Sequence, residues 1–153
     1  MAAGTRYGVE IRGVSPGDAA DVAALLQQIG HVVSAQEAAM RIEAARQAAG
    51  VVLVAADYGP LAGLIGVAWA ATLQHEHPVA RITTFVVSEA DRRRGIGRML
   101  LKAAAQAARA AGCDVLEAVT AEVQPEGLAF CQATGFIAAG SVLVRPLRRR
   151  SLT

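Results

Sequence analysis

A run of arginines and glycines at residues 92–98 is the part of this sequence best suited to chemistry. It reads Arg92, Arg93, Arg94, Gly95, Ile96, Gly97 and Arg98, and it separates an apolar segment from a long alanine-rich one. The unpaired N–H groups and positive dipole end of a helix N-terminus bind phosphates. Gly95 and Gly97 have no Cβ, so the main chain can approach a ligand closely. Arginines add charge around a pyrophosphate. The pattern therefore predicts a phosphate-binding loop.

The spacing of the glycines excludes two common phosphate loops. The G-x-x-x-x-G-K-[ST] arrangement of a Walker loop is absent. A dinucleotide fingerprint needs a third glycine, which is missing here. A glycine-containing turn that only starts a helix is the plain alternative at this point.

The elements around this loop follow from apolar periodicity and from capping residues. Ser34 with Glu37 predicts the start of one helix through a capping box. The expected strands cover 7–14, 51–57, 64–73, 81–87 and 115–120, and one or two closing strands follow over 136–147. The expected helices cover 15–29, 34–50, 98–111 and 125–134. This β-α-α-β-β-β-α-β-α-β order predicts one mixed α/β domain over residues 1–153.

Composition limits the classes of protein that this chain can represent. Its 153 residues fit one domain, and its apolar fraction of 54% includes much alanine. Residues 51–73 are interrupted by Asp57 and several glycines, so we expect strands there and no membrane span. The N-terminus has no apolar signal segment, so we expect a soluble cytoplasmic protein. The net charge of +2 and aromatic content of 4% do not favour a nucleic-acid partner.

Three segments in the same order resemble the general N-acetyltransferase (GNAT) superfamily, and in particular its small single-domain bacterial members. Arg92-x-x-Gly95-x-Gly97 after an apolar strand is similar to the R/Q-x-x-G-x-G/A motif of that family. Gly112-Cys113-x-x-Leu116 closes a helix and opens a strand, as in many members. The segment from Gln124 to Phe136 resembles N-x-x-A-x-x-L/F-Y-x-x-x-G-F. The resemblance covers the chain from about Arg81 onward, and the upstream order of elements fits as well.

The resemblance implies a fold and a co-substrate. The fold is a mixed central sheet with flanking helices, in which the strands at 81–87 and 115–120 are parallel and splay apart around the pantetheine arm of acetyl-CoA. Main-chain groups of Phe85 and Val87 would bind that arm, and the amides of residues 93–98 would hold the pyrophosphate. An N–H group aimed at the thioester oxygen would stabilise the oxyanion. The residues implied in acetyl-CoA binding are Phe85, Val86, Val87, Arg92, Arg93, Arg94, Gly95, Ile96, Gly97, Arg98, Gln124 and Phe130.

Three positions depart from the family pattern. Cys131 stands where many members have a tyrosine that protonates the CoA thiolate, Arg81 where many have a glutamate, and Gln124 where many have an asparagine. Cys131 has three interpretations: a small buried apolar residue, a proton donor to the leaving thiolate, or a nucleophile that forms an acyl-cysteine. We expect the first, because a free cysteine most often behaves as a small buried apolar residue. The acyl-cysteine is the least expected, because no activating histidine is close to Cys131 in sequence.

A polar turn before the loop strand supplies further candidates. His75 or Glu76 could accept the proton that an amine loses during attack, whereas a solvated polar turn is the plain alternative. His75, Glu76 and His77 lack a further cluster of ligands, so we expect no metal.

The leading hypothesis is an acetyl-CoA-dependent N-acyltransferase. In it, a primary amine of a small molecule or peptide attacks acetyl-CoA directly. A non-catalytic acyl-CoA-binding or sensor module is the alternative, because the usual tyrosine and glutamate are replaced. Residues 29–34 and 74–78, the expected acceptor side, carry no recognisable amine-binding signature. We expect a homodimer, from the apolar fraction of 54% and from the habit of the family.

Overall fold

The computed structural model describes residues 5, 6, 8–119, 125–140, 143 and 145–148. The chain divides into two compact units, residues 1–117 and 118–153. Each unit is described by itself.

The first unit is built on a mixed sheet. Its described strands are β1 (Thr5–Arg6), β2 (Val9–Gly13), β3 (Gly50–Ala56), β4 (Gly63–Ala70), β5 (Val79–Val87) and β6 (Val115–Glu117). They lie in the order β1-β2-β3-β4-β5-β6, and each pair of neighbours is antiparallel except β5 and β6, which are parallel. The parallel pair needs a crossover connection, which the chain between Val87 and Val115 supplies.

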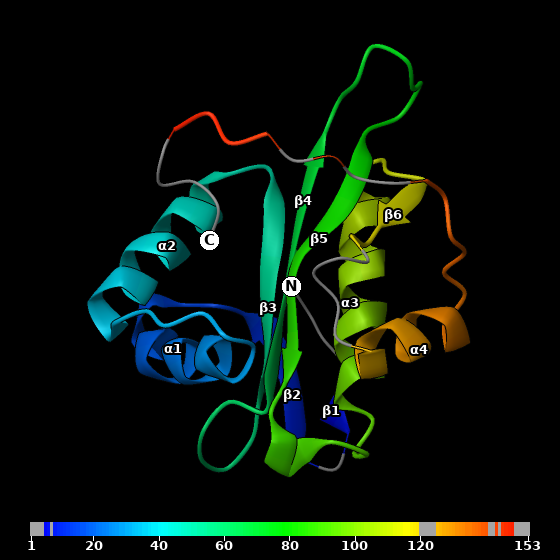
Figure 1. Ribbon diagram of the computed structural model, residues 1–153. Coiled ribbons are helices and arrows are strands. Elements are labelled where there is room, and N and C mark those ends of the chain that lie inside the picture. The colour runs from blue at the N-terminus through cyan, green and yellow to red at the C-terminus, as the bar shows by residue number, and fades with distance from the viewer. Residues whose placement is uncertain (1–4, 7, 120–124, 141–142, 144, 149–153) are drawn as a thin grey trace. The chain divides into compact units, whose positions relative to one another are not determined.

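Helices cover both faces of this sheet (Figure 1). The 3₁₀ turn η1 (Pro16–Asp18) leads into α1 (Ala19–Gln28), which is followed by α2 (Ala35–Gln47). Both helices pack on one face, and α3 (Ile96–Ala110), which follows the 3₁₀ turn η2 (Glu89–Asp91), packs on the other (Figure 1). This arrangement confirms the predicted α/β class with flanking helices.

The apolar face of each helix matches the sheet beneath it. Leu25 of α1 and Ile42 of α2 belong to one buried cluster with Val54, Leu64 and Val86 of the sheet. On α3 the buried side chains recur at three- and four-residue spacing, as expected for one stripe of a helix on a sheet: Ile96, Leu100, Ala103, Ala104, Ala107 and Ala108. Burial of these stripes supplies the main stabilisation.

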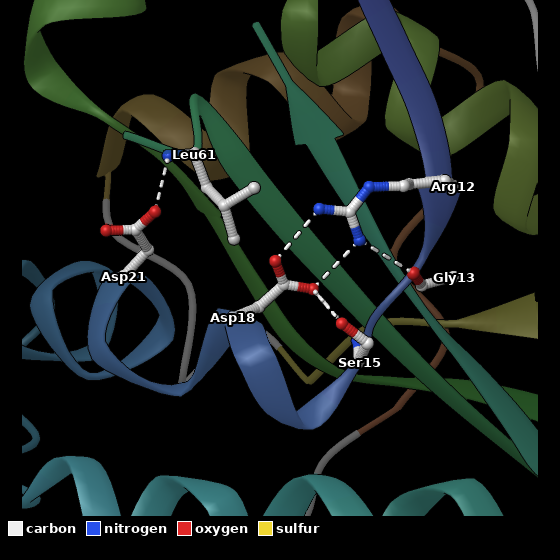
Figure 2. A network of polar contacts seen from close by, with 6 residues as sticks. All are labelled: Arg12, Gly13, Ser15, Asp18, Asp21 and Leu61. Carbon is white, nitrogen blue, oxygen red and sulfur yellow. Dashed lines mark hydrogen bonds and ion pairs between the residues drawn. The ribbon is translucent and has the colours of Figure 1, made fainter. Parts of the chain in front are cut away.

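A network of polar contacts fixes the start of α1 (Figure 2). The two terminal guanidinium nitrogens of Arg12, Nη1 and Nη2, donate to the Asp18 carboxylate at 2.8 Å, and the Ser15 main-chain N–H donates to the same carboxylate at 2.8 Å. Asp18 is 8% exposed, and the hydrogen bond from Arg12 lowers its pKa below the ordinary aspartate value. Asp21 accepts a hydrogen bond from the Leu61 N–H and so joins α1 to the turn between β3 and β4 (Figure 2).

Most predicted elements agree with the structure to within a few residues. The Ser34 hydroxyl accepts a hydrogen bond from the Glu37 N–H, as the predicted cap requires. Helix α3 begins at Ile96, so Ile96 and Gly97 lie in its first turn instead of in the preceding loop.

The predicted closing strands are not seen where the structure describes the chain. In the second unit, α4 (Pro125–Ala133) is followed by Phe136–Gly140 without strand pairing, and the described residues 143 and 145–148 form no strand either. Gly140 has a positive φ of 107° and Pro146 cannot donate a main-chain hydrogen bond, and both oppose a regular strand.

In the part of the chain that the structure describes, no helix has the length and apolar character needed to cross a membrane.

Candidate functional site

The backbone of the arginine–glycine loop has two residues in the left-handed conformation. Arg93 has a φ of 69°, the left-handed conformation that a residue with a Cβ rarely adopts. Gly95 has a φ of 79° and a ψ of 12° at the N-cap of α3, where glycine meets no such steric cost. Left-handed residues within a turn bring successive N–H groups to one side and create an anion-binding concavity.

The N-terminus of α3 is left open for a ligand. No side chain caps it, and its first turn holds no acidic residue. Helix α2 differs, since Ser34 caps it and Glu37 lies in its first turn. Among the residues that the structure describes, no carboxylate lies in the first turn of α3 to offset the positive end of its dipole, and this favours the binding of an anionic group there.

Contacts with Asp57 and Asp91, together with a main-chain hydrogen bond just before the loop, fix the position of the loop. The Ser88 N–H donates to the Ala62 carbonyl at 2.8 Å, which extends the ladder between β4 and β5 by one pair. The Arg94 guanidinium donates to the Asp57 carboxylate at 2.7 Å and also to Asp91. The hydrogen bond from Arg94 lowers the pKa of Asp57, and the two carboxylates raise the pKa of Arg94. The Arg94 side chain holds the loop through these two contacts. Its expected role in cofactor binding stays a prediction.

Gly63 on β4 sets how closely α3 approaches the sheet. A Cβ at Gly63 would lie 2.9 Å from the Val86 carbonyl, 3.1 Å from the Leu100 side chain and 3.3 Å from the Ile96 side chain. Ile96, which was expected to bind the cofactor, is only 1% exposed and packs its side chain into this contact. Sequence reasoning missed Gly63, because only the packing of α3 on β4 shows the need for a missing side chain.

The main chain of β5 divides its hydrogen-bonding groups between its two sides. Hydrogen-bonded and non-hydrogen-bonded residue pairs alternate along an antiparallel ladder. The hydrogen bond from Ser88 to Ala62 shows that these two residues form a hydrogen-bonded pair. By alternation, Val86 directs its N–H and C=O groups toward β4, whereas Phe85 and Val87 direct theirs away from β4. This direction agrees with the predicted role of Phe85 and Val87. The main-chain groups of Val86 face β4 within the sheet, and its side chain belongs to the core under α1 and α2.

The parallel pairing of β5 with β6 is short. It joins Val79 to Val115, Ala80 to Leu116 and Arg81 to Glu117, and β5 then continues to Val87 beyond the last described residue of β6. Two residues beyond Arg81 along β5, the ladder between β4 and β5 shifts by one residue, because Thr83 is an extra residue opposite Gly66 and Val67. Such a bulge bends a strand. The bulge was not foreseen, since no local residue pattern marks it.

Arg81 and Glu117 form an ion pair at the end of this parallel pairing. The Arg81 guanidinium lies 3.6 Å from the Glu117 carboxylate, and the two side chains are 53% and 47% exposed. Sequence reasoning identified Arg81 as a departure from the family and did not consider Glu117. The strand register brings the two residues together, so neither is recognisable as a partner from sequence spacing.

The turn between β4 and β5 lies beside the start of β6. His75, Glu76 and His77 line a shallow hollow of about 100 Å³ together with Asp114 and Val115. His75 Nδ1 is 2.6 Å from the Thr72 hydroxyl, and the Glu76 side chain is 90% exposed. Among the residues that the structure describes, no group of three or more histidine, cysteine, aspartate or glutamate side chains is arranged to hold a metal ion.

Three of the predicted residues, Gln124, Phe130 and Cys131, belong to the second unit. Cys131 is 6% exposed on α4, and burial raises the pKa of its thiol above the ordinary cysteine value. A buried thiol with a raised pKa is a poor proton donor and a poor nucleophile near neutral pH, which favours its interpretation as an apolar residue. Phe130 is half-buried on the same helix, and Gln124 lies outside the described residues.

Comparison with known proteins agrees with these features. Residues 23–136 match the model of the Acetyltransferase (GNAT) family, and the match extends over parts of both compact units. No curated protein sequence matches the chain significantly.

Solved structures share the fold. A putative acetyltransferase from Agrobacterium tumefaciens is 26% identical with a TM-score of 0.79, over 90% of this chain and 99% of that one. Glucosamine-6-phosphate N-acetyltransferase from Arabidopsis thaliana is 18% identical with a TM-score of 0.79, over 92% and 99%. An aminoglycoside N-acetyltransferase in complex with CoA is 19% identical with a TM-score of 0.76, over 97% and 99%. With the family model matched from residue 23 to residue 136, the chain belongs to the GNAT family of acetyltransferases.

Proposed function

We propose that this protein transfers the acetyl group of acetyl-CoA to a primary amine of a small molecule or peptide, by direct attack of the amine on the thioester. The observation that carries the proposal is the open N-terminus of α3, which follows a loop with left-handed residues at Arg93 and Gly95. This geometry fits the pyrophosphate of CoA, because N–H groups and the helix dipole converge there without an acidic residue in the first turn.

The other parts of the proposed site follow from β5. The main-chain groups of Phe85 and Val87 point away from β4, toward the side on which the parallel pairing with β6 ends. A pantetheine arm on this side would bind by main-chain hydrogen bonds, as an added strand does. The acetyl group would then lie near the start of β5.

The acceptor in this proposal is an amine of unidentified structure. Among the structural neighbours are enzymes whose names give glucosamine 6-phosphate and aminoglycosides as substrates. Both substrate classes carry a primary amine, which supports the reaction class and leaves the particular acceptor open.

The first experiment tests the phosphate loop by titration calorimetry. We expect CoA to bind and pantetheine, which has no pyrophosphate, to bind at least about tenfold more weakly. The variant Gly97→Glu would introduce a side chain and a negative charge into the first turn of α3, so CoA binding should be lost. Equal affinity for CoA and pantetheine would remove the loop from the proposal.

The second experiment measures thiol release from acetyl-CoA. The acceptors are kanamycin, glucosamine 6-phosphate, free lysine and a lysine-containing peptide. Amine-dependent release supports the transferase. If CoA binds but none of these amines causes thiol release, the result would favour a non-catalytic acyl-CoA sensor. The sequence supports this alternative, because Arg81 replaces the usual glutamate and Cys131 replaces the usual tyrosine.

A further inference from the structure

The last residues paired between β5 and β6 place a carboxylate at one defined point of the proposed site. Arg81 pairs with Glu117 in the parallel register, and no pairing of these two strands is described beyond them. Residues along a strand alternate between faces. Ala80 and Ile82 are buried, whereas Arg81 is exposed, and Glu117 is exposed at the same register position. Both side chains therefore lie on one open face of the sheet.

This point is also where an extended arm along β5 would end. From Val87, beside the loop, to Arg81 the strand spans six residues, or about 20 Å. An extended pantetheine chain is of the same order of length. An arm that starts at the phosphate loop and follows the side of β5 away from β4 would bring its thioester close to Arg81 and Glu117, where the described pairing of β5 with β6 ends.

We propose that Glu117 accepts the proton of the attacking amine and that Arg81 is its positioning partner. This inference rests on the proposed acetyl transfer. The ion pair at 3.6 Å restricts the carboxylate to the reacting end of the strands, and about half of each side chain stays open to solvent and substrate. The carboxylate that many relatives carry on the loop strand is thus supplied here from the neighbouring strand.

The acceptor arrives as an ammonium ion and gives one proton to the Glu117 carboxylate. The nitrogen lone pair then forms the C–N bond with the thioester carbonyl carbon, the C–S bond breaks, and the sulfur leaves with the electron pair. The second nitrogen proton passes to the CoA thiolate, and Glu117 returns its proton to solvent. No oxidant, metal or covalent enzyme intermediate is needed.

Other titratable groups near this point are less well placed. Asp114 lies in the turn before β6, and His75, Glu76 and His77 lie in the turn before β5. The Glu76 side chain is 90% exposed, and it forms an ion pair with His77 at 4.0 Å. Only Glu117 among these carboxylates occupies a strand position with a register partner at the end of the parallel pairing.

The test compares Glu117→Gln and Glu117→Asp with a matched control on α2. Glu43 and Arg46 lie 3.4 Å apart with side chains 52% and 49% exposed, so Glu43→Gln removes an equivalent carboxylate far from β6 in sequence. For each variant, calorimetry measures CoA affinity and the thiol assay measures kcat and KM between pH 6 and pH 10. The acceptor is whichever amine the wild-type protein uses.

We expect Glu117→Gln to lower kcat about 100-fold or more at pH 7, the usual size of a general-base effect, with CoA affinity unchanged. The loss should shrink as the pH rises, because more of the amine is already deprotonated. Glu117→Asp should recover part of the rate, and Glu43→Gln should match the wild type.

Three results would overturn the assignment: a kcat for Glu117→Gln within about threefold of wild type, a loss that does not change with pH, or a loss of CoA affinity that accounts for the whole effect. A wild-type protein that binds CoA but releases no thiol with any amine would instead overturn the proposed function itself, and with it this step.

Discussion

The guanidinium of Arg94 donates a hydrogen bond to the carboxylate of Asp57 at 2.7 Å, across a sequence separation of 37 residues. This contact joins the loop before α3 to the end of β3, and a second contact from Arg94 to Asp91 joins the loop to η2. The loop that we propose to bind pyrophosphate is therefore held by side-chain contacts before any ligand arrives.

Arg94→Ala should weaken CoA binding about tenfold, because the loop must then be ordered on binding. Arg94→Lys should rescue little, since an ammonium group cannot reproduce the forked contact with both carboxylates. Calorimetry with CoA measures both effects. Arg41→Ala, which removes an exposed partner of Glu37 on α2, is the control and should bind CoA like the wild type. Unchanged affinity in Arg94→Ala would show that the loop needs no such support.

Gly63→Ala should destabilise the fold by about 1–3 kcal/mol and weaken CoA binding, because the added methyl group pushes α3 away from β4. The Val86 carbonyl and the Leu100 side chain cannot both yield at 2.9 and 3.1 Å. Chemical denaturation and calorimetry measure the two effects. Gly13→Ala is the control: a Cβ there meets nothing within 4 Å, so stability and affinity should hold. A Gly63→Ala variant as stable as Gly13→Ala would contradict the packing argument.

Asp18→Asn should lower the free energy of unfolding by about 2 kcal/mol at pH 7, because it breaks a largely buried ion pair with Arg12. Arg12 lowers the pKa of Asp18 in the folded state. The stability that this carboxylate contributes is therefore fully present above the unfolded pKa, about 4, and is lost as the pH falls through the lower folded value. The difference between the variant and the wild type should narrow over that acidic range. Denaturation curves from pH 7 to pH 2 test this, and a difference that stays constant would exclude the ion pair as its source.

Cys131→Ala should keep kcat for acetyl transfer within about threefold of wild type, because a catalytic proton donor would cost roughly 100-fold or more. Burial raises the pKa of this thiol, which opposes both proton donation and nucleophilic attack at neutral pH. Intact-mass measurement after incubation with acetyl-CoA alone should show no acetyl adduct. A thousandfold loss of kcat, or a stable adduct at Cys131, would make the thiol catalytic.

A homodimer remains a prediction. Several large apolar side chains are almost fully exposed in the first unit, among them Leu73 in the turn before β5 and Val32 before α2. Exposed apolar side chains of this size favour association. Light scattering should give about twice the chain mass of 15.8 kDa, and a single monomer peak across a range of concentrations would exclude the dimer.

The sequence by itself determined the class of fold and the identity of the loop. Apolar periodicity, the Ser34 cap and the Arg92–Gly97 motif are local patterns, and local patterns depend on residues within a few positions of one another. For that reason the helices and strands of the first unit, except the short strand β1, were predicted to within a few residues, and the family was recognisable.

Only the tertiary structure decided which side chains meet. The Arg81–Glu117 pair depends on the register between two strands that are separated by α3, and the Arg94–Asp57 pair depends on a loop that meets a distant turn. The Thr83 bulge and the close contact at Gly63 likewise depend on neighbours across the sheet. These partners are far apart in sequence, and the packing of α3 and the pairing of β5 with β4 and β6 bring them together. The spacing of residues along the chain therefore does not identify them.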